Sequence, residues 1–261
     1  MSALAPELAP EHARAWVDRW DRQQEVYLPE REERFTAMID AVVAAAGWPD
    51  PLVLDLGTGP GSLGARLLDR LPAATVVALD SDPVLLALGR AAYGDRAGLW
   101  FTDADLRAPG WPDLLGLDRP LDAAVSTTAL HWLPEADLRM MYASVAGLLR
   151  PGGLLLNGDH FVVDDPMLAR LERVLLEQED ARRFPRGHTE DWETWWRALA
   201  ADPALAELAA ERRRRWAEEE HHGTESGRLD THVAALRAAG FGEIGTLWQR
   251  GETRLLCAVR S

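Results

Sequence analysis

The chain has 261 residues and a formal net charge of −14, and this length predicts one domain with additions. The acidic balance argues against a nucleic acid as partner or substrate, because a protein that binds phosphates needs a basic face. No apolar run reaches the roughly 18 residues of a membrane span. Residues 1–10 lack the basic start and apolar core of a signal peptide, and the only cysteine is Cys257. We therefore expect a cytoplasmic protein without membrane contact.

Residues 11–47 read as two helices, and an apolar run then marks the first predicted strand. This run leads into Asp55, after which glycines stand at positions 57, 59 and 61 and an apolar-periodic segment spans 63–71. The pattern predicts a buried strand, a tight turn and a helix. Because glycine has no side chain and permits positive φ, the turn would let a nucleotide-like ligand approach the backbone.

The glycine spacing separates this turn from the common dinucleotide-binding fingerprint. That fingerprint has the pattern Gly-x-Gly-x-x-Gly, and counting from Gly57 its third glycine would fall on Ser62. Asp55, two residues before the first glycine, would repel a pyrophosphate and would tolerate or attract a cationic ligand. A nicotinamide-dependent oxidoreductase is therefore the less favoured alternative.

The following segments continue an alternating order of strands and helices. The apolar run 75–80 ends in Asp80, whose carboxylate at a strand tip can accept both hydroxyls of a ribose. Asp82 and Pro83 then predict the start of a helix. Three further strands are predicted, at 99–102, 121–126 and 154–157, and Arg150–Gly153 is predicted to form a turn before the last of them. Near the C-terminus an amphipathic helix is predicted at 229–239. A two-stranded hairpin follows, with strands predicted at 244–249 and 253–259.

Three sequence motifs point in one direction: the loop at 55–61, the segment Ala129–Leu133, and Leu-Arg-Pro-Gly-Gly at 149–153. In this order they resemble the class I S-adenosylmethionine (SAM)-dependent methyltransferases of the small-molecule type typified by trans-aconitate methyltransferase. The resemblance covers residues 51–160 and 229–260. It implies an α/β fold with a Rossmann-like, doubly wound, seven-stranded sheet whose last strand is antiparallel and inserts beside the sixth. SAM is the implied cofactor, with S-adenosylhomocysteine (SAH) as its product.

The resemblance also divides the chain into parts. Residues 1–48 form an N-terminal helical extension. Residues 49–163 and 228–261 form the SAM-binding catalytic core, and residues 164–227 form a helical cap over the acceptor site. Tryptophans in the cap either build a small core of their own or line an apolar acceptor pocket, and the sequence leaves both open. The arginines at 212–215, followed by Glu218–Glu220, are interpreted as a solvated, self-neutralising helix face.

Cofactor-binding roles carry over residue by residue. Asp80 is expected to hold the ribose, and Asp103 followed by Ala104 to bind the adenine amino group, with Asp105 as the rival acid. Tyr27, Arg31 or Gln24 of the N-terminal extension is expected to reach the SAM carboxylate. The full set of expected cofactor-binding residues is Asp55, Gly57, Thr58, Gly59, Gly61, Asp80, Ser81, Asp103, Ala104, Ser126, Tyr27 and Arg31.

Two histidines are the candidate catalytic residues. Histidine is the natural base near neutral pH, and His131 and His160 follow the fourth and fifth predicted strands, where methyltransferase active sites open. A base is needed only if the acceptor arrives protonated, whereas a carboxylate acceptor needs none. We assign no metal site, because the adjacent His221 and His222 cannot both face one point from a helix.

The expected function is methyl transfer to a small metabolite or natural product, with O-methylation ahead of N- or C-methylation. Enzymes that methylate amino groups of DNA bases and protein amides carry Asn/Asp-Pro-Pro-Tyr/Phe after the fourth strand, where this chain has Ser126–Ala129. That difference argues against such acceptors. A SAM-binding enzyme of non-methylating chemistry and a non-catalytic SAM-binding regulator remain as alternatives. The sequence does not predict the oligomeric state.

Overall fold

The computed structural model describes residues 8–28, 30–162, 165–185, 187, 190–216 and 227–261, apart from the side chains of Val26 and Tyr27. The helices are α1 Pro10–Tyr27, α2 Arg31–Ala46, α3 Ser62–Arg70, α4 Pro83–Tyr93, α5 Glu135–Leu148, α6 Pro166–Arg183, α7 Trp192–Ala200, α8 Ala206–Trp216 and α9 Leu229–Ala238. Short 3₁₀ turns span Trp111–Leu115 and Leu130–Trp132. The strands are β1 Leu52–Leu56, β2 Thr75–Asp80, β3 Leu99–Asp103, β4 Leu121–Thr127, β5 Leu149–His160, β6 Phe241–Arg250 and β7 Thr253–Arg260.

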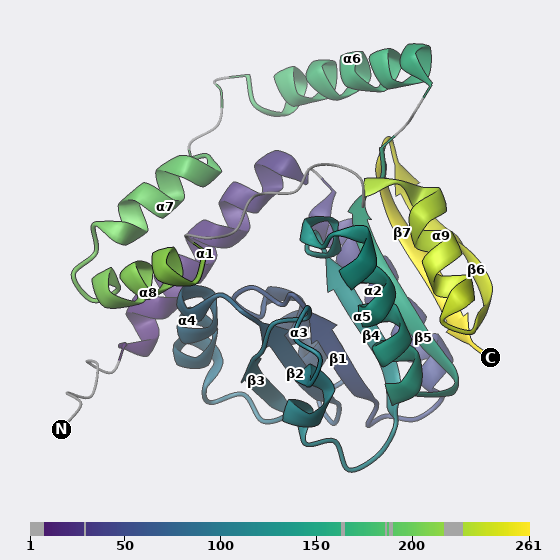
Figure 1. The fold of residues 1–261 in the computed structure, drawn as a ribbon. Helices are drawn as coiled ribbons and strands as arrows, with labels where there is room; N and C mark the ends of the chain where they lie inside the picture. Colours follow the sequence, from purple (N-terminus) through teal and green to yellow (C-terminus); the bar gives the residue numbers. More distant parts are fainter. Residues whose placement is uncertain (1–7, 29, 163–164, 186, 188–189, 217–226) are drawn as a thin grey trace.

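The strands form one seven-stranded sheet in the order β3-β2-β1-β4-β5-β7-β6 (Figure 1). The five strands from β3 to β5 run parallel, whereas β7 is antiparallel to both β5 and β6. The predicted fold class is thus confirmed, including the last strand inserted beside the sixth. The parallel strands β1 and β4 are almost wholly buried, as expected when helices cover both faces of a sheet.

The fifth strand is longer than predicted. It begins at Leu149, and its register with β4 shifts so that Leu121 pairs with Leu149 but Ala123 with Leu154. The predicted turn at 150–153 is therefore an irregularity inside the strand, where Gly152 takes a positive φ of 74°. Glycine tolerates this conformation, so the chain bulges and then rejoins the ladder.

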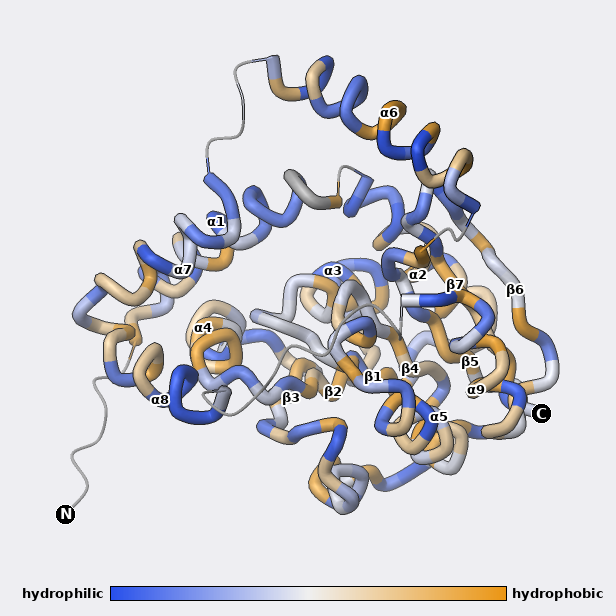
Figure 2. Tube along the Cα trace, turned by 45° about the horizontal axis from the view of Figure 1, so that its top comes forward, coloured by the Kyte–Doolittle hydropathy of each residue, from blue (hydrophilic) through white to orange (hydrophobic). Residues whose placement is uncertain are grey.

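Two apolar cores flank the sheet. On one face α2 and α3 pack on the strands through residues such as Phe35, Met38 and Leu67. On the other face α5 and α9 pack through residues such as Tyr142 and Leu236. Figure 2 shows hydrophobic residues gathered in the strands and in the helix faces turned towards them. The sheet is thereby held rigid, and its strand ends present the loops of the site.

A third core joins the N-terminal helix to part of the insertion. Trp195 of α7 is fully buried and meets Trp16 and Trp20 of α1 with ring centroids 5.6 and 5.0 Å apart. Helices α4 and α8 complete this cluster. The sequence left two alternatives for the cap tryptophans, a small core of their own or an acceptor pocket. Trp195 belongs to a small core, which it shares with α1.

The remaining helix of the insertion lies elsewhere. In Figure 1, α6 stands apart from α7 and α8, and none of its side chains is buried. Arg250 of β6 pairs with Glu179 of this helix and with Glu30, which fixes α6 near the ends of β6 and β7. The described part of residues 164–227 is therefore spread over two places, and a single cap over the acceptor stays a prediction. Among the described helices, none is long and apolar enough to cross a membrane.

Candidate active site

The glycine loop between β1 and α3 has the conformation that its glycines predict. Gly57, Gly59 and Gly61 have φ of 67°, 58° and 87°. A Cβ on Gly57 would lie 2.3 Å from the Cβ of Ala129, and one on Gly61 would lie 2.7 Å from the ring of Phe101. Backbone conformation and close packing therefore both require glycine at these two positions. Gly59 is more open, since its nearest neighbour would be the Trp20 ring at 3.7 Å.

Asp55, at the end of β1, lies beneath this loop. Its side chain is fully buried, and its Oδ2 accepts a hydrogen bond of 2.6 Å from the Thr58 hydroxyl. Burial raises the pKa of Asp55 to about 7 despite that hydrogen bond, and the nearby charge of Asp80 raises it further. The carboxyl group thus fixes the start of the loop. Ser126 has a similar supporting contact, because its hydroxyl donates to the Leu56 carbonyl at 2.8 Å.

Asp80, at the end of β2, connects the loop to the next helix. Its Oδ2 accepts from Gly59 N at 2.7 Å, and its Oδ1 accepts from Asp82 N at 2.8 Å. Burial raises the pKa of Asp80 to about 6. Asp82 in turn caps α4 through its hydrogen bonds with Val84 N and Leu85 N, as the sequence predicts. Each oxygen of Asp80 keeps a further lone pair with which it could accept a hydroxyl.

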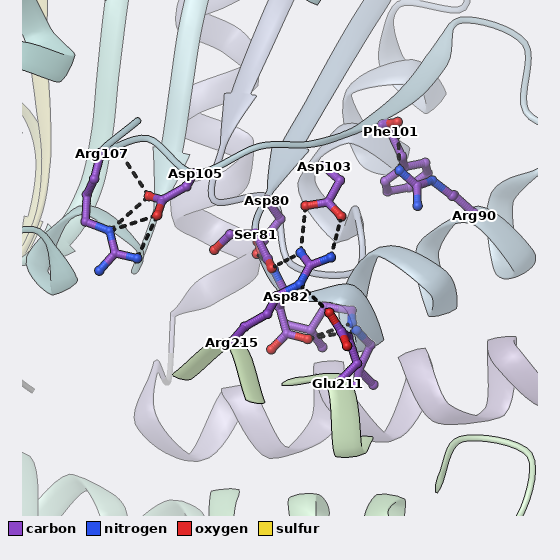
Figure 3. A network of polar contacts seen from close by, with 12 residues as sticks. Asp80, Ser81, Asp82, Arg90, Phe101, Asp103, Asp105, Arg107, Glu211 and Arg215 are labelled. Carbon is purple, nitrogen blue, oxygen red and sulfur yellow. Dashed lines mark hydrogen bonds and ion pairs between the residues drawn. The ribbon is translucent and has the colours of Figure 1, made fainter. Parts of the chain in front are cut away.

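The two rival acids at the end of β3 and in the loop after it, Asp103 and Asp105, have different partners (Figure 3). Asp105 is paired with Arg107 at 2.7 Å, two residues along the same loop. Asp103 is held by both terminal nitrogens of Arg215 from α8, at 2.9 and 3.0 Å. The backbone N–H of Ala104, one residue beyond β3, donates to the Asp80 carbonyl at 3.0 Å. That N–H group is therefore already engaged in a hydrogen bond within the protein.

The sequence-based interpretation of the arginine run as a solvated face is wrong for two of its members. Arg212 and Arg215 lie three residues apart, on one side of α8, and pair with the core acids Asp82 and Asp103. Arg214 pairs with Glu211 of its own helix, whereas Glu218–Glu220 lie outside the described residues, so the predicted pairing with them is untested. Charge pattern alone could not separate the two sides. The one signal in the sequence was the three-residue spacing of Arg212 and Arg215, which places both on the same side of a helix.

The N-terminal candidates lie above the loop. Tyr27 ends α1, and its side chain is outside the described part of the structure. Arg31 is buried, lies over the Phe35 ring at 4.5 Å and pairs with Asp21 at 3.0 Å. Asp21 also accepts from the Ser62 hydroxyl at 2.7 Å at the start of α3. Arg31 therefore reaches the glycine loop through Asp21, and its expected contact with a ligand carboxylate stays a prediction.

The two candidate catalytic histidines lie together at the carboxyl ends of β4 and β5. His131 Nδ1 lies 2.8 Å from Oδ1 of Asp159, a buried carboxylate that also accepts from the backbone N–H of His160 at 2.9 Å. Burial lowers the pKa of His131, but the charge and hydrogen bond of Asp159 outweigh it, so the net shift is upward. The pKa of His160 is lowered, chiefly by burial. The two histidines therefore differ, because His131 is more readily protonated than an ordinary histidine and His160 less readily.

Arg34 is a site residue that sequence reasoning did not single out. It lies on α2, is 1% exposed, and its guanidinium packs against β5 where Gly158 leaves room. Its Nη2 donates to the Thr127 hydroxyl at 2.5 Å, while Nε and Nη1 have no hydrogen-bond partner. Burial lowers the pKa of Arg34 to about 10, and the charge of Asp159 opposes that shift, so the group is a cation at neutral pH.

The surroundings of Arg34 favour a small anionic ligand. Arg34 and His160 line one pocket, which also holds apolar side chains, two further arginines and the carboxylates of Glu30 and Glu252. Beside them, Thr128 takes a positive φ of 49°, which among the described residues no other non-glycine residue does. Such strain is concentrated at functional sites. A buried cation with unused donors is costly unless an acceptor reaches it.

Within the described residues, no group of three or more potential metal ligands converges. His221 and His222 lie outside them, so their predicted lack of a metal role is untested.

Comparison with known proteins agrees with this geometry. Residues 53–153 match the family model of a methyltransferase domain. Trans-aconitate 2-methyltransferase of Streptomyces coelicolor is 32% identical over 176 residues, which are 65% of this chain and 53% of that protein. The protein of the same name from Azoarcus sp. is 35% identical over 136 residues, or 52% of this chain and 49% of its own. The chain thus spans about half the length of these relatives.

Solved structures support the fold. Magnesium protoporphyrin IX methyltransferase from Synechocystis PCC 6803, with bound SAH, superimposes with a TM-score of 0.55 at 19% identity and covers 94% of each chain. An amino pentose methyltransferase from Micromonospora echinaspora, with bound SAM, gives a TM-score of 0.53 at 19% identity, covering 88% of this chain and 91% of its own. At such identities the likeness concerns the architecture alone.

Proposed function

We propose that this chain, which belongs to the class I SAM-dependent methyltransferase family, transfers the methyl group of SAM to a small organic acceptor. The observation that carries the proposal is the pairing of the glycine loop with Asp80. A backbone N–H of the loop donates to a carboxylate oxygen at the next strand end at 2.7 Å, which holds Asp80 beside the glycine loop. A nucleoside with its hydroxyls on Asp80 would lie against a loop without side chains.

The residues present fit SAM. The loop acid Asp55 disfavours a phosphate but not a cation. Asp80 would accept the ribose hydroxyls, and Asp103 would accept the adenine amino group. SAM supplies a methyl group already activated by its sulfonium. What the protein must add is alignment of the acceptor and exclusion of water, and positioning can supply up to roughly 7–11 kcal/mol.

We propose further that the methylated atom is a carboxylate oxygen. Arg34 offers two unused donors, and the raised pKa of His131 makes it more cationic, so both favour an anion beside the ends of β4 and β5. A carboxylate needs no base, and the nucleophile keeps its charge until it is held in line. The curated relatives are named for trans-aconitate, a carboxylic acid. His160, which is neutral, could instead take the proton of a hydroxyl acceptor.

Calorimetric titration with SAM and SAH tests the cofactor assignment. Wild type is expected to bind both in the micromolar range, and Asp80→Ala to bind neither. Asp95→Ala is the matched control, because that carboxylate is 77% exposed. Absence of binding by well-folded wild type would refute the proposal. Product mass separates the alternatives, since a methyltransferase adds one methyl group and a non-catalytic SAM-binding regulator leaves every acceptor unchanged.

Arg34 is tested by its methionine and lysine variants. Arg34→Met should raise KM for a carboxylate acceptor and leave SAH affinity within about twofold, and Arg34→Lys should recover part of the loss because it restores the charge. A variant that loses SAH binding instead would place Arg34 at the cofactor and contradict its assignment to the acceptor.

A further inference from the structure

Helix α8 reaches from the insertion to the carboxyl ends of β2 and β3. Arg215 in its last turn forms a fork on Asp103, with Nη1 at 2.9 Å from Oδ1 and Nη2 at 3.0 Å from Oδ2. Its Nη1 also donates to the Ser81 carbonyl at 3.1 Å. The guanidinium therefore bridges the residue that follows β2 and the last residue of β3 (Figure 3).

A second arginine anchors the same helix. Arg212 Nε donates to Asp82 at 2.6 Å, and its guanidinium lies between Trp196 and Trp216, at 3.7 and 4.0 Å from their ring centroids. Asp82 is buried and caps α4. The side chains of Arg212 and Asp82 are 20% and 1% exposed, so this pair is better shielded from water than the Arg215 pair and can hold α8 in place when Arg215 changes partner.

The Arg215 contact is the exchangeable one. The side chains of Arg215 and Asp103 are 35% and 40% exposed, and exposed ion pairs contribute little because water and salt compete with them. A second acid stands ready for the released guanidinium, since Arg215 Nε already lies 3.1 Å from Glu211. Asp103 lies opposite Asp80 in the register of β2 and β3, so whatever occupies it lies beside the ribose-binding acid.

We propose that Arg215 competes with the adenine amino group for the carboxylate of Asp103, which makes the last turn of α8 a gate on the cofactor site. This inference rests on the proposed function, because it takes Asp103 as the adenine-recognising acid. The two-pronged fork uses one lone pair on each oxygen and covers the edge that faces Ser81. An adenine that binds at the carboxyl ends of β2 and β3 displaces the fork, and Arg215 turns to Glu211.

The gate is tested by SAH titration of wild type, Arg215→Ala and Arg215→Gln. Both variants should bind SAH about two- to fivefold more tightly, which is the range that an exposed ion pair allows. Arg213→Ala is the matched control, because Arg213 is an exposed arginine of the same helix that contacts neither Asp103 nor Glu211 in the described structure, and it should bind like wild type. Thermal unfolding of each variant checks that α8 remains folded.

Salt gives an independent readout. Raising NaCl from about 0.05 to about 0.5 M screens the Arg215–Asp103 pair, so wild type should bind SAH more tightly and Arg215→Ala should not respond. Because SAH carries one positive and one negative charge, direct screening of the ligand is small. If wild type binds SAH and the Arg215 variants bind it equally or more weakly, the gate is refuted and the proposed function is not. Absence of SAH binding by every protein overturns the proposed function and the gate with it.

Discussion

Asp55→Asn is expected to make the stability of the protein less dependent on pH. Burial raises the pKa of this carboxyl group from 3.8 to about 7 in the folded protein. Between those values the folded protein keeps a proton that the unfolded chain has released. Stability from this group is therefore present at low pH and is lost as pH rises towards 7. At roughly 1.4 kcal/mol per pH unit, the whole interval amounts to about 4 kcal/mol.

Asparagine cannot ionise, but its side-chain oxygen can still accept the hydrogen bond from Thr58. From about pH 5 to about pH 8, the free energy of unfolding of Asp55→Asn should therefore rise relative to wild type by about 3 kcal/mol. Urea denaturation of both proteins at each pH measures this difference. Asp95→Asn, at a site 77% exposed, should stay within about 0.5 kcal/mol of wild type at each pH.

A difference between Asp55→Asn and wild type that stays constant with pH would refute the reasoning. It would mean that the carboxylate is ionised beneath the loop at neutral pH, so that the folded protein supplies a compensating donor. The loop acid would then act as a permanent negative charge, and its contribution to the selection of a cationic ligand would be larger than the structure indicates.

Three further outcomes follow from the same geometry. Gly57→Ala should destabilise the protein by about 1–3 kcal/mol and weaken SAH binding, because the added methyl would lie 2.3 Å from Ala129 Cβ at a positive φ; unchanged melting and affinity would contradict this. Asp159→Asn should lower the pKa of His131, measurable by NMR titration, since its carboxylate is what raises that pKa against burial; an unchanged titration would be the contrary result. SAH affinity should fall by up to about tenfold per pH unit below pH 6, where Asp80 takes up a proton, and should remain level if Asp80 is not the ribose acceptor.

The sheet and the cofactor loop were predictable because their signals are local. Apolar runs that end in Asp55 and Asp80, glycines at fixed spacing and a C-terminal hairpin each specify structure within a few residues. The confirmed strand order follows from these signals together with the family resemblance. Even the error in the fifth strand was local, since the glycines at 152 and 153 form a bulge where a turn was expected.

The acceptor side and the contacts of α8 were not predictable in the same way. Arg34 and Asp159 are close only because α2 packs on β5, and nothing near either residue in the sequence marks that contact. Similarly, which arginines of α8 face Asp82 and Asp103 depends on how that helix rests on α4. Charge and periodicity describe a helix face, but only tertiary packing identifies the partner.

The central claim is methyl transfer to a carboxylate, and one measurement tests it most directly. The protein is incubated with methyl-labelled SAM and a set of small carboxylic acids, and the products are followed by mass spectrometry before and after mild alkaline hydrolysis. The account predicts a product that gains one labelled methyl group and loses it to alkali, as a methyl ester does, with SAH formed in equal amount. A labelled product that resists alkali, or no labelled product from a protein that binds SAM, would contradict it.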